Sequence, residues 1–565
     1  MVAEVELVEQ VAEDVHASAF GSDCRRFTIA ALIGAVVAAI PFLWLLLDLW
    51  SSNPGLLRTA YSSGYAGNFY DLQARAILHG HLWLANGSTG YEACVHGGRQ
   101  STSFGLFPSI LRMPVLMATH GLDGRLTVVS TLLAWVTTGA FGILMMWRCR
   151  VMVRPTARVS TPEAISFGAL TAALLGGSVL LYLGAEPYVF NEDLMWSIAF
   201  TLATMFALLG VLEQPSWRRV IVLGVMALGV NLSNLPMAYA CVAAGLLGAG
   251  WFAIGKAGDE LRRWGLPVAA AVVAPFLVGC AINWAKFGIL VGIPVSDQIS
   301  YHVCGVAHLN GGKYLGLRYL PGDIVAYLQP AGLHFGGTFP YITAPLAPAG
   351  QIGTRFVETS RTASLPASMP LLFLLACWGF VTSLVTGQHI SGIRQVRLVL
   401  LPMVLPIGAI LIYGWILNRF LVEFLPLLAL GAAVGLIDIF RRLDARSARA
   451  GWITTGAIAL LALFSVVANF GISATPFWTW SKPQLASYID TQRSLGGTEP
   501  VLQGSRLPGF APAGTIFIRG DCAGLYISDG ESPVKVNAGE NWLPVEMGQN
   551  EHLCRELAAE VTATS

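Results

Sequence analysis

Long apolar windows recur along this chain and limit the folds open to it. A helix needs about 20 mostly apolar residues to cross a bilayer. Eleven windows approach that length: 27–49, 124–147, 163–184, 194–212, 219–233, 235–255, 265–284, 368–388, 398–416, 420–439 and 453–472. With only 12% charged residues, the chain is not an ordinary soluble protein, in which about a quarter are charged. We therefore expect an all-α polytopic membrane protein with about 11 transmembrane helices.

The connection between the fifth and sixth windows has two possible forms. The window at 219–233 is short, and the polar run 231–236 with Pro236 separates it from the next window. The two segments could form a hairpin or one bent unit, because polar breaks are tolerated where other parts of a membrane protein satisfy the backbone.

Short turns dense in arginine occur at every second connection along the chain. The basic turns contain Arg25, Arg26, Arg148, Arg150, Arg154, Arg158, Arg218, Arg219, Lys256, Arg262, Arg263, Arg394, Arg397, Arg441, Arg442, Arg446 and Arg449. The positive-inside rule places such turns in the cytoplasm. The sequence thus predicts a multi-pass protein of the plasma (inner) membrane, with a cytoplasmic N-terminus and, since the span count is odd, an extracytoplasmic C-terminus. The acidic first 20 residues do not resemble a cleavable signal, so the first span is expected to be a signal anchor.

The predicted organisation has three parts. They are a cytoplasmic tail (1–26), a transmembrane domain (27–473) and an extracytoplasmic C-terminal domain (474–565). Two external segments of the transmembrane domain, 51–122 and 285–367, are too long to be simple connections, and long loops often carry function.

The C-terminal part has a different pattern. Short runs with strand-like alternation, at 515–519 and 524–528, lie between Pro- and Gly-containing turns. This pattern favours a small β-rich appendage. Four cysteines fall outside by the predicted topology: Cys94, Cys304, Cys522 and Cys554. They allow three pairings, of which we favour Cys522 with Cys554 within the appendage.

Asp71 is the first candidate for chemistry. It lies in the first external segment in a run where Asp71 and Arg75 share one helical face. Tyr70 precedes it and His79 follows it. A general base that takes a proton from a sugar hydroxyl needs a carboxylate near a cation and partly shielded from water. The alternative is a surface ion pair of Asp71 with Arg75 on an amphipathic helix lying along the membrane.

A second group of acids, Glu186, Glu192 and Asp193, forms a short turn before an apolar window. Carboxylates at a membrane boundary are costly unless paired or solvated, so Glu192 and Asp193 are candidates for the site. The alternative is a solvated loop in which Asn191 caps the next helix and the acids favour its dipole.

Cations at the outer boundary are candidates for binding a phosphate. Arg419 lies between two spans on the outer side, where the positive-inside rule disfavours it, and Glu423 follows one turn later. A guanidinium can hold a lipid phosphate with two hydrogen bonds, although Arg419 could also simply snorkel to the interface. Lys286 opens the second external segment and could act similarly. His302, His308 and His334 are expected to be loop histidines or contacts to the acceptor rather than metal ligands, and no CxxC or His-rich spacing suggests zinc.

Several runs resemble the GT-C superfamily of integral membrane glycosyltransferases. They are 70–74 (Tyr-Asp-Leu-Gln-Ala), 104–108 (Phe-Gly-Leu-Phe-Pro), the acidic turn leading to Trp196, 283–288 with Lys286 and Gly288, and 419–426 with Arg419, Glu423 and Pro426. The resemblance extends from Phe27 to Ile439 and is closest to bacterial, actinobacterial-type members that use polyprenyl-phosphate sugars, including arabinofuranosyl- and mannosyltransferases. The C-terminal part is similar to the small periplasmic extension of some such proteins.

This resemblance implies a function in cell-wall biogenesis. It implies inverting transfer of a sugar from a polyprenyl-phosphate donor to a glycan, lipoglycan or protein acceptor, with Asp71 as general base and Glu192 beside it. Arg419, Lys286 and Arg75 would bind the donor phosphate, and Asp193, Tyr70, His79 and Glu423 are further candidates. Membrane lipid, donor and acceptor are the expected partners, with no nucleic acid. No cofactor is certain: the lipid-linked sugar is a donor substrate, and a divalent metal is possible but not supported by the residues.

Two other classes compete with an enzyme. A transporter or flippase for lipid-linked sugars usually shows inverted repeats and polar residues at the bilayer midplane, whereas the charges here gather at the outer boundary. A non-catalytic scaffold of a cell-envelope complex would keep the fold without needing Asp71. The chain has neither a GxGxxG nor a Walker A run, which argues against a nucleotide-linked donor.

Overall fold

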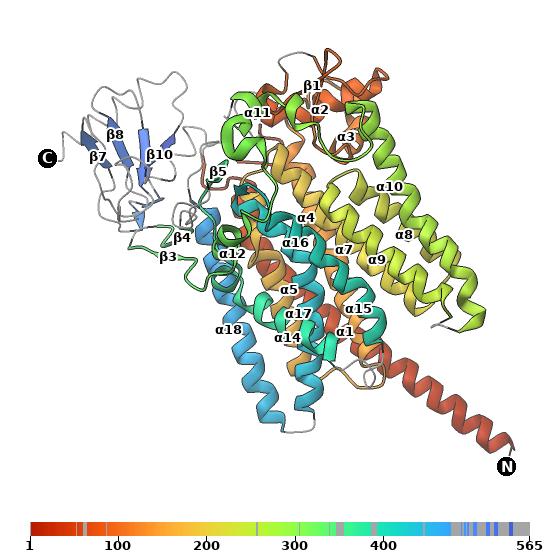
Figure 1. Ribbon diagram of the computed structural model, residues 1–565. Coiled ribbons are helices and arrows are strands. Elements are labelled where there is room, and N and C mark those ends of the chain that lie inside the picture. The colour runs from red at the N-terminus through yellow and green to blue at the C-terminus, as the bar shows by residue number, and fades with distance from the viewer. Residues whose placement is uncertain are drawn as a thin grey trace.

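The computed structural model describes most of the chain up to Thr475 and short pieces beyond it. The described residues are 2–51, 54–59, 65–85, 88–255, 258–303, 306–337, 339–345, 355–385, 392–444, 447–475, 488, 491–492, 494–495 and the four strands between 501 and 545. Helices dominate, and Figure 1 shows them gathered into one elongated bundle with its short strands at one end.

Eight helical segments among the described residues are long and apolar enough to cross a membrane. They lie in α1 (Val2–Leu46), α4 (Thr127–Val153), α7 (Val189–Glu213), α9 (Leu235–Ala253), η2 (Asp259–Trp264) with α10 (Gly265–Phe287), α15 (Ile393–Leu400) with η6 (Leu401–Met403) and α16 (Val404–Ile410), η7 (Asn418–Phe424) with α17 (Leu425–Leu443), and α18 (Ala448–Ser473). A multi-pass membrane protein is thereby supported.

The span count differs from the eleven expected. A ninth span results if α5 (Thr161–Gly176) and α6 (Val179–Ala185), which meet at a 40° bend, are counted as one. The other two windows form shorter helices, α8 (Trp217–Asn231, 15 residues) and α14 (Pro370–Val385, 16 residues). Each window is mostly helical, but the helices α8 and α14 fall short of the length that a straight crossing needs. α8 and α9 are separate helices lying side by side (Figure 1), so the hairpin alternative holds.

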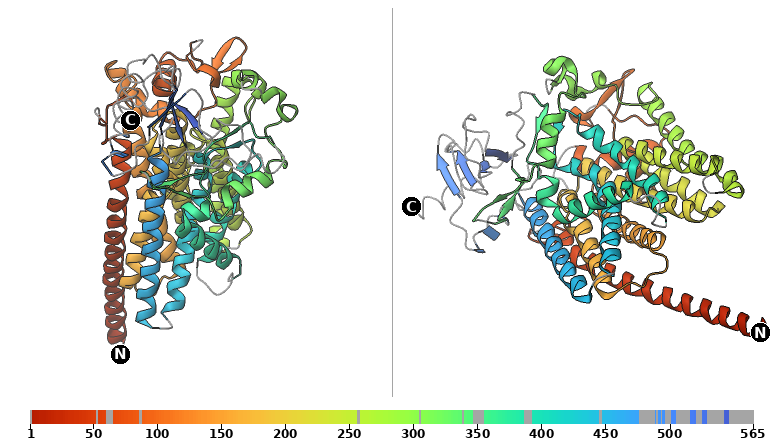
Figure 2. Two further views of the ribbon diagram at one scale, coloured as in Figure 1. Left: turned by 90° about the vertical axis from the view of Figure 1, so that its left-hand side faces the viewer. Right: turned by 60° about the horizontal axis from the view of Figure 1, so that its bottom comes forward.

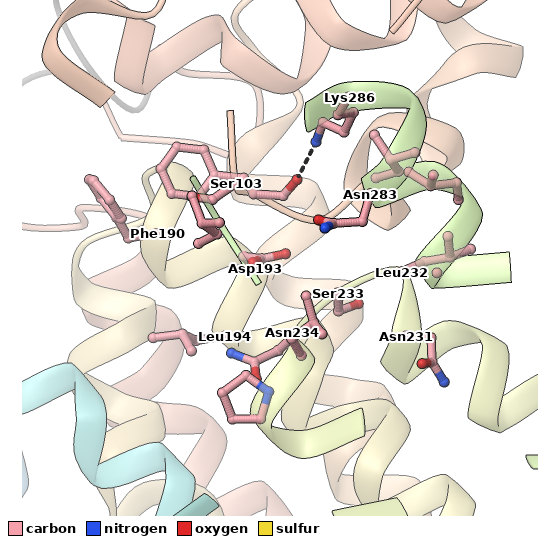
Figure 3. Close-up of a pocket in the computed structure, with 18 of the residues that line it drawn as sticks. Ser103, Phe190, Asp193, Leu194, Asn231, Leu232, Ser233, Asn234, Asn283 and Lys286 are labelled. Carbon is pink, nitrogen blue, oxygen red and sulfur yellow. Dashed lines mark hydrogen bonds between the residues drawn. The ribbon is translucent and has the colours of Figure 1, made fainter. Parts of the chain in front are cut away.

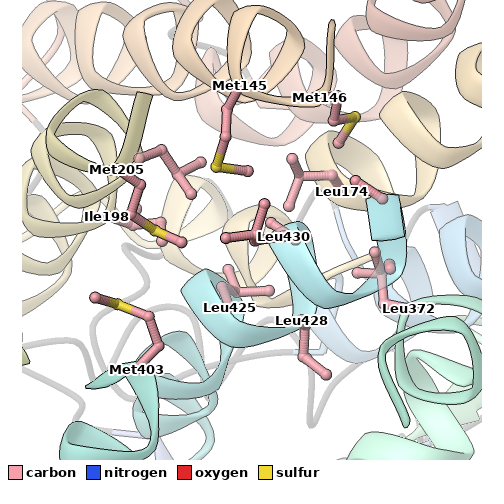
Figure 4. Close-up of a cluster of buried hydrophobic side chains, with 14 of the residues drawn as sticks. Met145, Met146, Leu174, Ile198, Met205, Leu372, Met403, Leu425, Leu428 and Leu430 are labelled. Carbon is pink, nitrogen blue, oxygen red and sulfur yellow. The ribbon is translucent and has the colours of Figure 1, made fainter. Parts of the chain in front are cut away.

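Close packing of small residues joins pairs of helices in the bundle. A Cβ on Gly379 of α14 would lie 1.9 Å from the carbonyl oxygen of Gly431 in α17. Gly34 of α1 approaches the backbone of Gly168 in α5 equally closely. Such contacts are typical of membrane helices, which associate through van der Waals packing. Figure 4 shows the adjoining core, where Met145 of α4, Met205 of α7 and Leu430 of α17 meet.

The arginine-rich turns lie at the end of the bundle opposite to the two long external segments (Figures 1 and 2). Several of these arginines are paired. Arg150 Nε lies 2.6 Å from Glu163 Oε1, and Arg441 and Arg442 both bind Asp438. The separation agrees with the alternation of basic turns in the sequence, and the assignment of this end to the cytoplasm remains a prediction.

The opposite end carries the short elements. The first external segment forms α2 (Tyr65–Leu78), η1 (Gly90–Glu92), the hairpin β1 (Cys94–His96) with β2 (Arg99–Ser101), and α3 (Phe107–Ala118). The second forms η3 (Val295–Asp297), α11 (Ile299–Val303), η4 (Val306–Gly312), α12 (Leu320–Leu328), the antiparallel pair β3 (His334–Phe335) and β4 (Ile342–Thr343), β5 (Glu358–Thr359) and α13 (Leu365–Ser368). β5 pairs in parallel with β6 (Trp415–Ile416), which precedes η7.

Four strands follow the last helix. β7 (Val501–Gly504), β8 (Ile516–Arg519), β9 (Leu525–Ser528) and β10 (Trp542–Val545) form a sheet in the order β10-β9-β8-β7. β8 and β9 fall within the runs predicted as strands. Their place in an independent extracytoplasmic domain stays a prediction, and the pairing of Cys522 with Cys554 lies outside the described residues. Cys94 is a buried free thiol.

Candidate functional site

A cavity of about 300 Å³ lies where five parts of the chain meet at the end of the bundle that carries the external segments. Its walls come from the loop before α3, the start of α7, the turn between α8 and α9, the end of α10 with the residues after it, and the segment 413–420. Three of the ionisable candidates line it: Asp193, Lys286 and Arg419. Figure 3 shows Asp193 of α7, Asn234 at the start of α9, and Asn283 and Lys286 of α10 around the cavity.

The loop before α3 explains the Phe-Gly-Leu-Phe-Pro run. A Cβ on Gly105 would lie 2.4 Å from the carbonyl oxygen of Leu232, so only glycine allows this loop to touch the α8–α9 turn. The amide of Phe107 donates to the same Leu232 oxygen at 2.9 Å. Pro108 then occupies the first turn of α3, where its missing N–H is not needed. The motif therefore builds one wall of the cavity.

Asp193 supplies the carboxylate of the cavity. It lies near the start of α7, its side chain is buried, and its Oδ1 has no hydrogen-bond partner among the described residues. The backbone N–H of Gly105 donates to this carboxylate. A buried acceptor without a partner is costly, and a bound ligand or water that donates to it would remove that cost.

Lys286 and Arg419 supply two cations from different elements. Lys286 Nζ, near the end of α10, donates to the carbonyl oxygen of Phe104 at 3.2 Å (Figure 3). Arg419 Nη1 donates to the hydroxyl of Tyr188 at 2.8 Å, and its guanidinium lies 4.5 Å from the centre of the Phe190 ring. These contacts fix both side chains while leaving further N–H groups of each cation available to an anion.

Glu423 lies just behind the same wall. Its Oε1 accepts a hydrogen bond from Asn234 Nδ2 at 3.3 Å, and its Oε2 has no partner in the described part of the chain. Asn234 also caps α9, because its side-chain oxygen accepts from the N–H of Met237. Glu423 thus does not line the cavity itself, but it binds Asn234, which does.

Asp71 and Glu192 lie in a separate buried network rather than in the lining of this cavity. Arg112 of α3 joins them: its Nη1 is 3.1 Å from Asp71 Oδ1, and its Nη2 is 2.6 Å from Glu192 Oε2. The amide of Gly124 donates to the other oxygen of Asp71 at 2.5 Å. Burial raises the pKa of Asp71 above its ordinary value, although Arg112 and the Gly124 N–H oppose the shift. The surface ion pair weighed for Asp71 is therefore wrong, since Asp71 is only 2% exposed.

Tyr70 belongs to this network as well. Its hydroxyl donates to the carbonyl oxygen of Val189 at 3.0 Å, and the Arg112 guanidinium lies 5.3 Å from the centre of its ring. Tyr70 thereby ties α2 to the first residue of α7, four residues before Asp193.

Arg75 and His79 point elsewhere. Arg75 binds Asp123 with two hydrogen bonds, the shorter 2.6 Å, and also donates to the carbonyl oxygens of Leu116 and Thr119 at the end of α3. His79 is exposed, with Nδ1 2.7 Å from the oxygen of Arg75. Both therefore lie outside the lining of the cavity.

The alternative of a solvated acidic turn capped by Asn191 is also wrong. Asn191 lies inside α7, and its amide donates to the carbonyl oxygen of Glu186 at 2.9 Å instead of capping the helix. Glu186 and Glu192 are buried rather than solvated. Burial raises the pKa of Glu186 well above its usual range, against the opposing effect of Arg419.

The sequence did not single out Arg112. It is the one charged residue of α3, and a lone charge within an apolar helix at a membrane is a usable signal of a buried partner. Among the described residues, no group of three or more His, Cys, Asp or Glu side chains could hold a metal ion.

Comparisons with known proteins give a likeness to solved structures. No protein-family model matches the chain, and no curated protein matches it. The structure is similar to an archaeal oligosaccharyltransferase, AglB from Archaeoglobus fulgidus, solved in complex with an inhibitory peptide and a dolichol-phosphate. The two are 15% identical, with a TM-score of 0.38, over 81% of this chain and 56% of that chain. The chain thus spans just over half the length of that protein.

Proposed function

We propose that the protein is a membrane glycosyltransferase of GT-C type. It moves a sugar from a polyprenyl-phosphate donor to a glycan acceptor at the outer face of the membrane, with inversion at the anomeric carbon. The observation that carries this proposal is the cavity at the end of the bundle with the external segments, lined by the cations Lys286 and Arg419 and by Asp193, whose Oδ1 has no partner among the described residues.

The donor phosphate would bind to Arg419 and Lys286. A phosphate carries the negative charge that both cations favour, and a guanidinium can hold it with two parallel hydrogen bonds. The prenyl chain would follow α10. Ile282 of this helix lines the cavity, and Leu277 and Val278 on the same helix are exposed apolar residues, as expected of a surface facing lipid.

Asp193 would act as the general base. It takes the proton of the acceptor hydroxyl while the acceptor oxygen forms a bond to the anomeric carbon of the donor sugar. The bond from that carbon to the phosphate oxygen breaks, and polyprenyl phosphate leaves with the electron pair. Lys286 and Arg419 offset the charge that develops on the leaving phosphate, which is the electrostatic contribution expected of fixed cations.

The geometry favours Asp193 over Asp71 as the base. Both oxygens of Asp71 already accept hydrogen bonds, from Arg112 and Gly124, whereas Asp193 has an oxygen left for a substrate. A general base must reach the proton that it removes. We therefore assign Asp71, Arg112 and Glu192 to holding α2, α3 and α7 together, with Asp193 positioned by that support.

The experiment is transfer from labelled polyprenyl-phosphate sugars, with arabinofuranose and mannose donors in parallel, to glycan acceptors in membranes containing the full chain. Asp193→Asn should lower the rate by about 10²–10⁴, the usual loss for a positioned base. Asp259→Asn is the matched control, because Asp259 is exposed in the turn before α10. Wild-type protein that moves the lipid-linked sugar across the bilayer without cleaving it would contradict the proposal and indicate a flippase.

A further inference from the structure

A second cavity adjoins the first one. It has a volume of about 290 Å³ and shares Tyr413, Arg419 and Phe420 with the first cavity. Its other lining residues are Glu92, Ser300, Val306, Val357, Glu358, Trp415 and Leu417. A molecule bound here would therefore lie beside the proposed phosphate site, with Arg419 in the wall between them.

Two aromatic rings form one side of this second cavity. The rings of Tyr413 and Trp415 lie 4.7 Å apart at an angle of 31°, and Tyr314 packs edge-on against both. The backbone holds them in place from two sides. Gly414 donates its N–H to the oxygen of Tyr314 at 2.7 Å and accepts from the N–H of Val357 at 2.8 Å. The rings are thus a fixed apolar surface rather than mobile loop side chains.

Two carboxylates come from the two long external segments. Glu358 pairs with Trp415 in the parallel register of β5 and β6, which fixes its backbone beside that of Trp415. Glu92 ends η1, and the next residue, Ala93, accepts a hydrogen bond from the N–H of Ile299 at 2.9 Å. Burial raises the pKa of Glu92 to about 7, although Arg419 opposes the shift. Both acids are held by main-chain contacts and face the same space.

This lining suits a polyhydroxylated, uncharged ligand better than a phosphate. Carboxylates accept hydrogen bonds from hydroxyl groups, and aromatic rings offer apolar contact area at low conformational cost. Two acids would repel a phosphate, which the adjoining cavity can hold with Lys286 and Arg419. A basic peptide is the competing ligand, because carboxylates also attract lysine and arginine.

We propose that this second cavity binds the saccharide end of the acceptor, with Glu92 and Glu358 accepting hydrogen bonds from its hydroxyl groups and with Trp415 and Tyr413 packing against a sugar ring. The inference rests on the proposed transferase function and names its acceptor class. Bound in this way, the acceptor hydroxyl is directed past Arg419 toward the cavity that contains Asp193.

The test uses the full chain in lipid nanodiscs with a panel of short neutral oligosaccharides of mannose, arabinose and galactose. Ligand-observed NMR measures binding, and steady-state transfer gives the acceptor KM, the donor KM and kcat. We expect Trp415→Ala, Glu92→Gln and Glu358→Gln each to raise the acceptor KM about tenfold, the effect of losing one good contact. The donor KM should stay within about twofold, since these residues lie outside the first cavity.

Matched control variants distinguish a loss of acceptor binding at the second cavity from general misfolding. Trp452→Ala removes a tryptophan that is 52% exposed on α18, and Glu260→Gln changes an exposed acid in the turn before α10. Both should leave the acceptor KM unchanged. Thermal unfolding and binding of polyprenyl phosphate alone confirm that each variant is folded.

The outcomes distinguish this inference from the function on which it rests. If wild type cleaves the donor but all three variants keep the wild-type acceptor KM, the second cavity is not the acceptor site and the transferase function stands. A lysine-rich peptide that displaces the oligosaccharides, or binds where none of them does, would also overturn the inference. If wild type does not cleave any donor, yet the oligosaccharides bind and the variants weaken them, the transferase function fails while a saccharide site remains.

Discussion

Arg112 Nη2 lies 2.6 Å from Glu192 Oε2, so the residue just before Asp193 is anchored by a guanidinium from α3. The same guanidinium reaches Asp71 of α2. Three helices therefore meet at one buried cation, and the backbone that carries Asp193 is fixed by it. Removing Arg112 would leave both Asp71 and Glu192 without this cation.

Removing Arg112 should destabilise the protein strongly. Arg112→Ala leaves two buried carboxylates unpaired, and breaking a buried pair in this way typically costs about 3–5 kcal/mol. We expect a clear fall in the midpoint of thermal unfolding in detergent. Arg75→Ala is the control on the neighbouring helix: its partner Asp123 is 39% exposed, and such surface pairs contribute under about 1 kcal/mol. Equal losses for the two variants would contradict the assigned role of Arg112.

Asp71→Asn should lower the stability of the fold, whereas kcat of the molecules that do fold should change little. The substitution weakens the pair with Arg112 and one contact to the Gly124 N–H, but leaves the proposed base Asp193 in place. We expect kcat of the correctly folded fraction to stay above about a tenth of wild type, well short of the loss expected for a general base. Active-site titration with a labelled donor corrects for the folded fraction. If kcat falls by about 10²–10⁴, the usual loss for a general base, while stability stays normal, Asp71 and not Asp193 is the general base.

Arg419→Ala should weaken donor binding. Charge-assisted hydrogen bonds are worth about 1.5–3 kcal/mol, so we expect the donor KM to rise about ten- to a hundredfold. Arg419→Lys should recover only part of this, because an ammonium cannot reproduce the planar fork that holds a phosphate. Arg318→Ala, which changes an exposed arginine of the second external segment, is the matched control. An unchanged donor KM in Arg419→Ala would leave Arg419 with the role of an interfacial anchor.

The orientation can be tested with reporter fusions. A periplasm-active reporter inserted at Gly98 or placed after Ser565 should be active, and the same reporter fused after Arg449 should not, because the basic turns are predicted to be cytoplasmic. Immunoblots confirm equal amounts of each fusion. Activity after Arg449 would reverse the assignment of the two ends.

Local patterns predicted the helices well and the long-range partners poorly. Every apolar window is mostly helical, since apolar composition and length are properties of one segment. The sequence also identified Asp193, Lys286 and Arg419, which the fold brings into one cavity. It could not show that Asp71 binds Arg112, which is 41 residues away, because the i, i+4 spacing pointed to Arg75 instead.

Local patterns also could not specify the number of spans or the second cavity. Whether a 15-residue helix such as α8 counts as a span depends on its tilt and neighbours, which composition does not specify. Glu92 and Glu358 are unremarkable in sequence, and they come together only because η1 and β5 from two external segments meet near Arg419.

Acceptor binding should depend on pH through Glu92. Its pKa of about 7 results from burial, with Arg419 lowering it and Glu358 raising it. Glu92 is thus largely protonated at about pH 6 and ionised at about pH 8, and a carboxylate is the stronger acceptor for a sugar hydroxyl. We expect the acceptor KM to fall as the pH rises through this range, and Glu92→Gln to flatten this part of the profile. Glu358→Gln removes the like charge, so it should shift the remaining dependence to lower pH, and a profile that Glu92→Gln leaves unaltered would show that another group titrates.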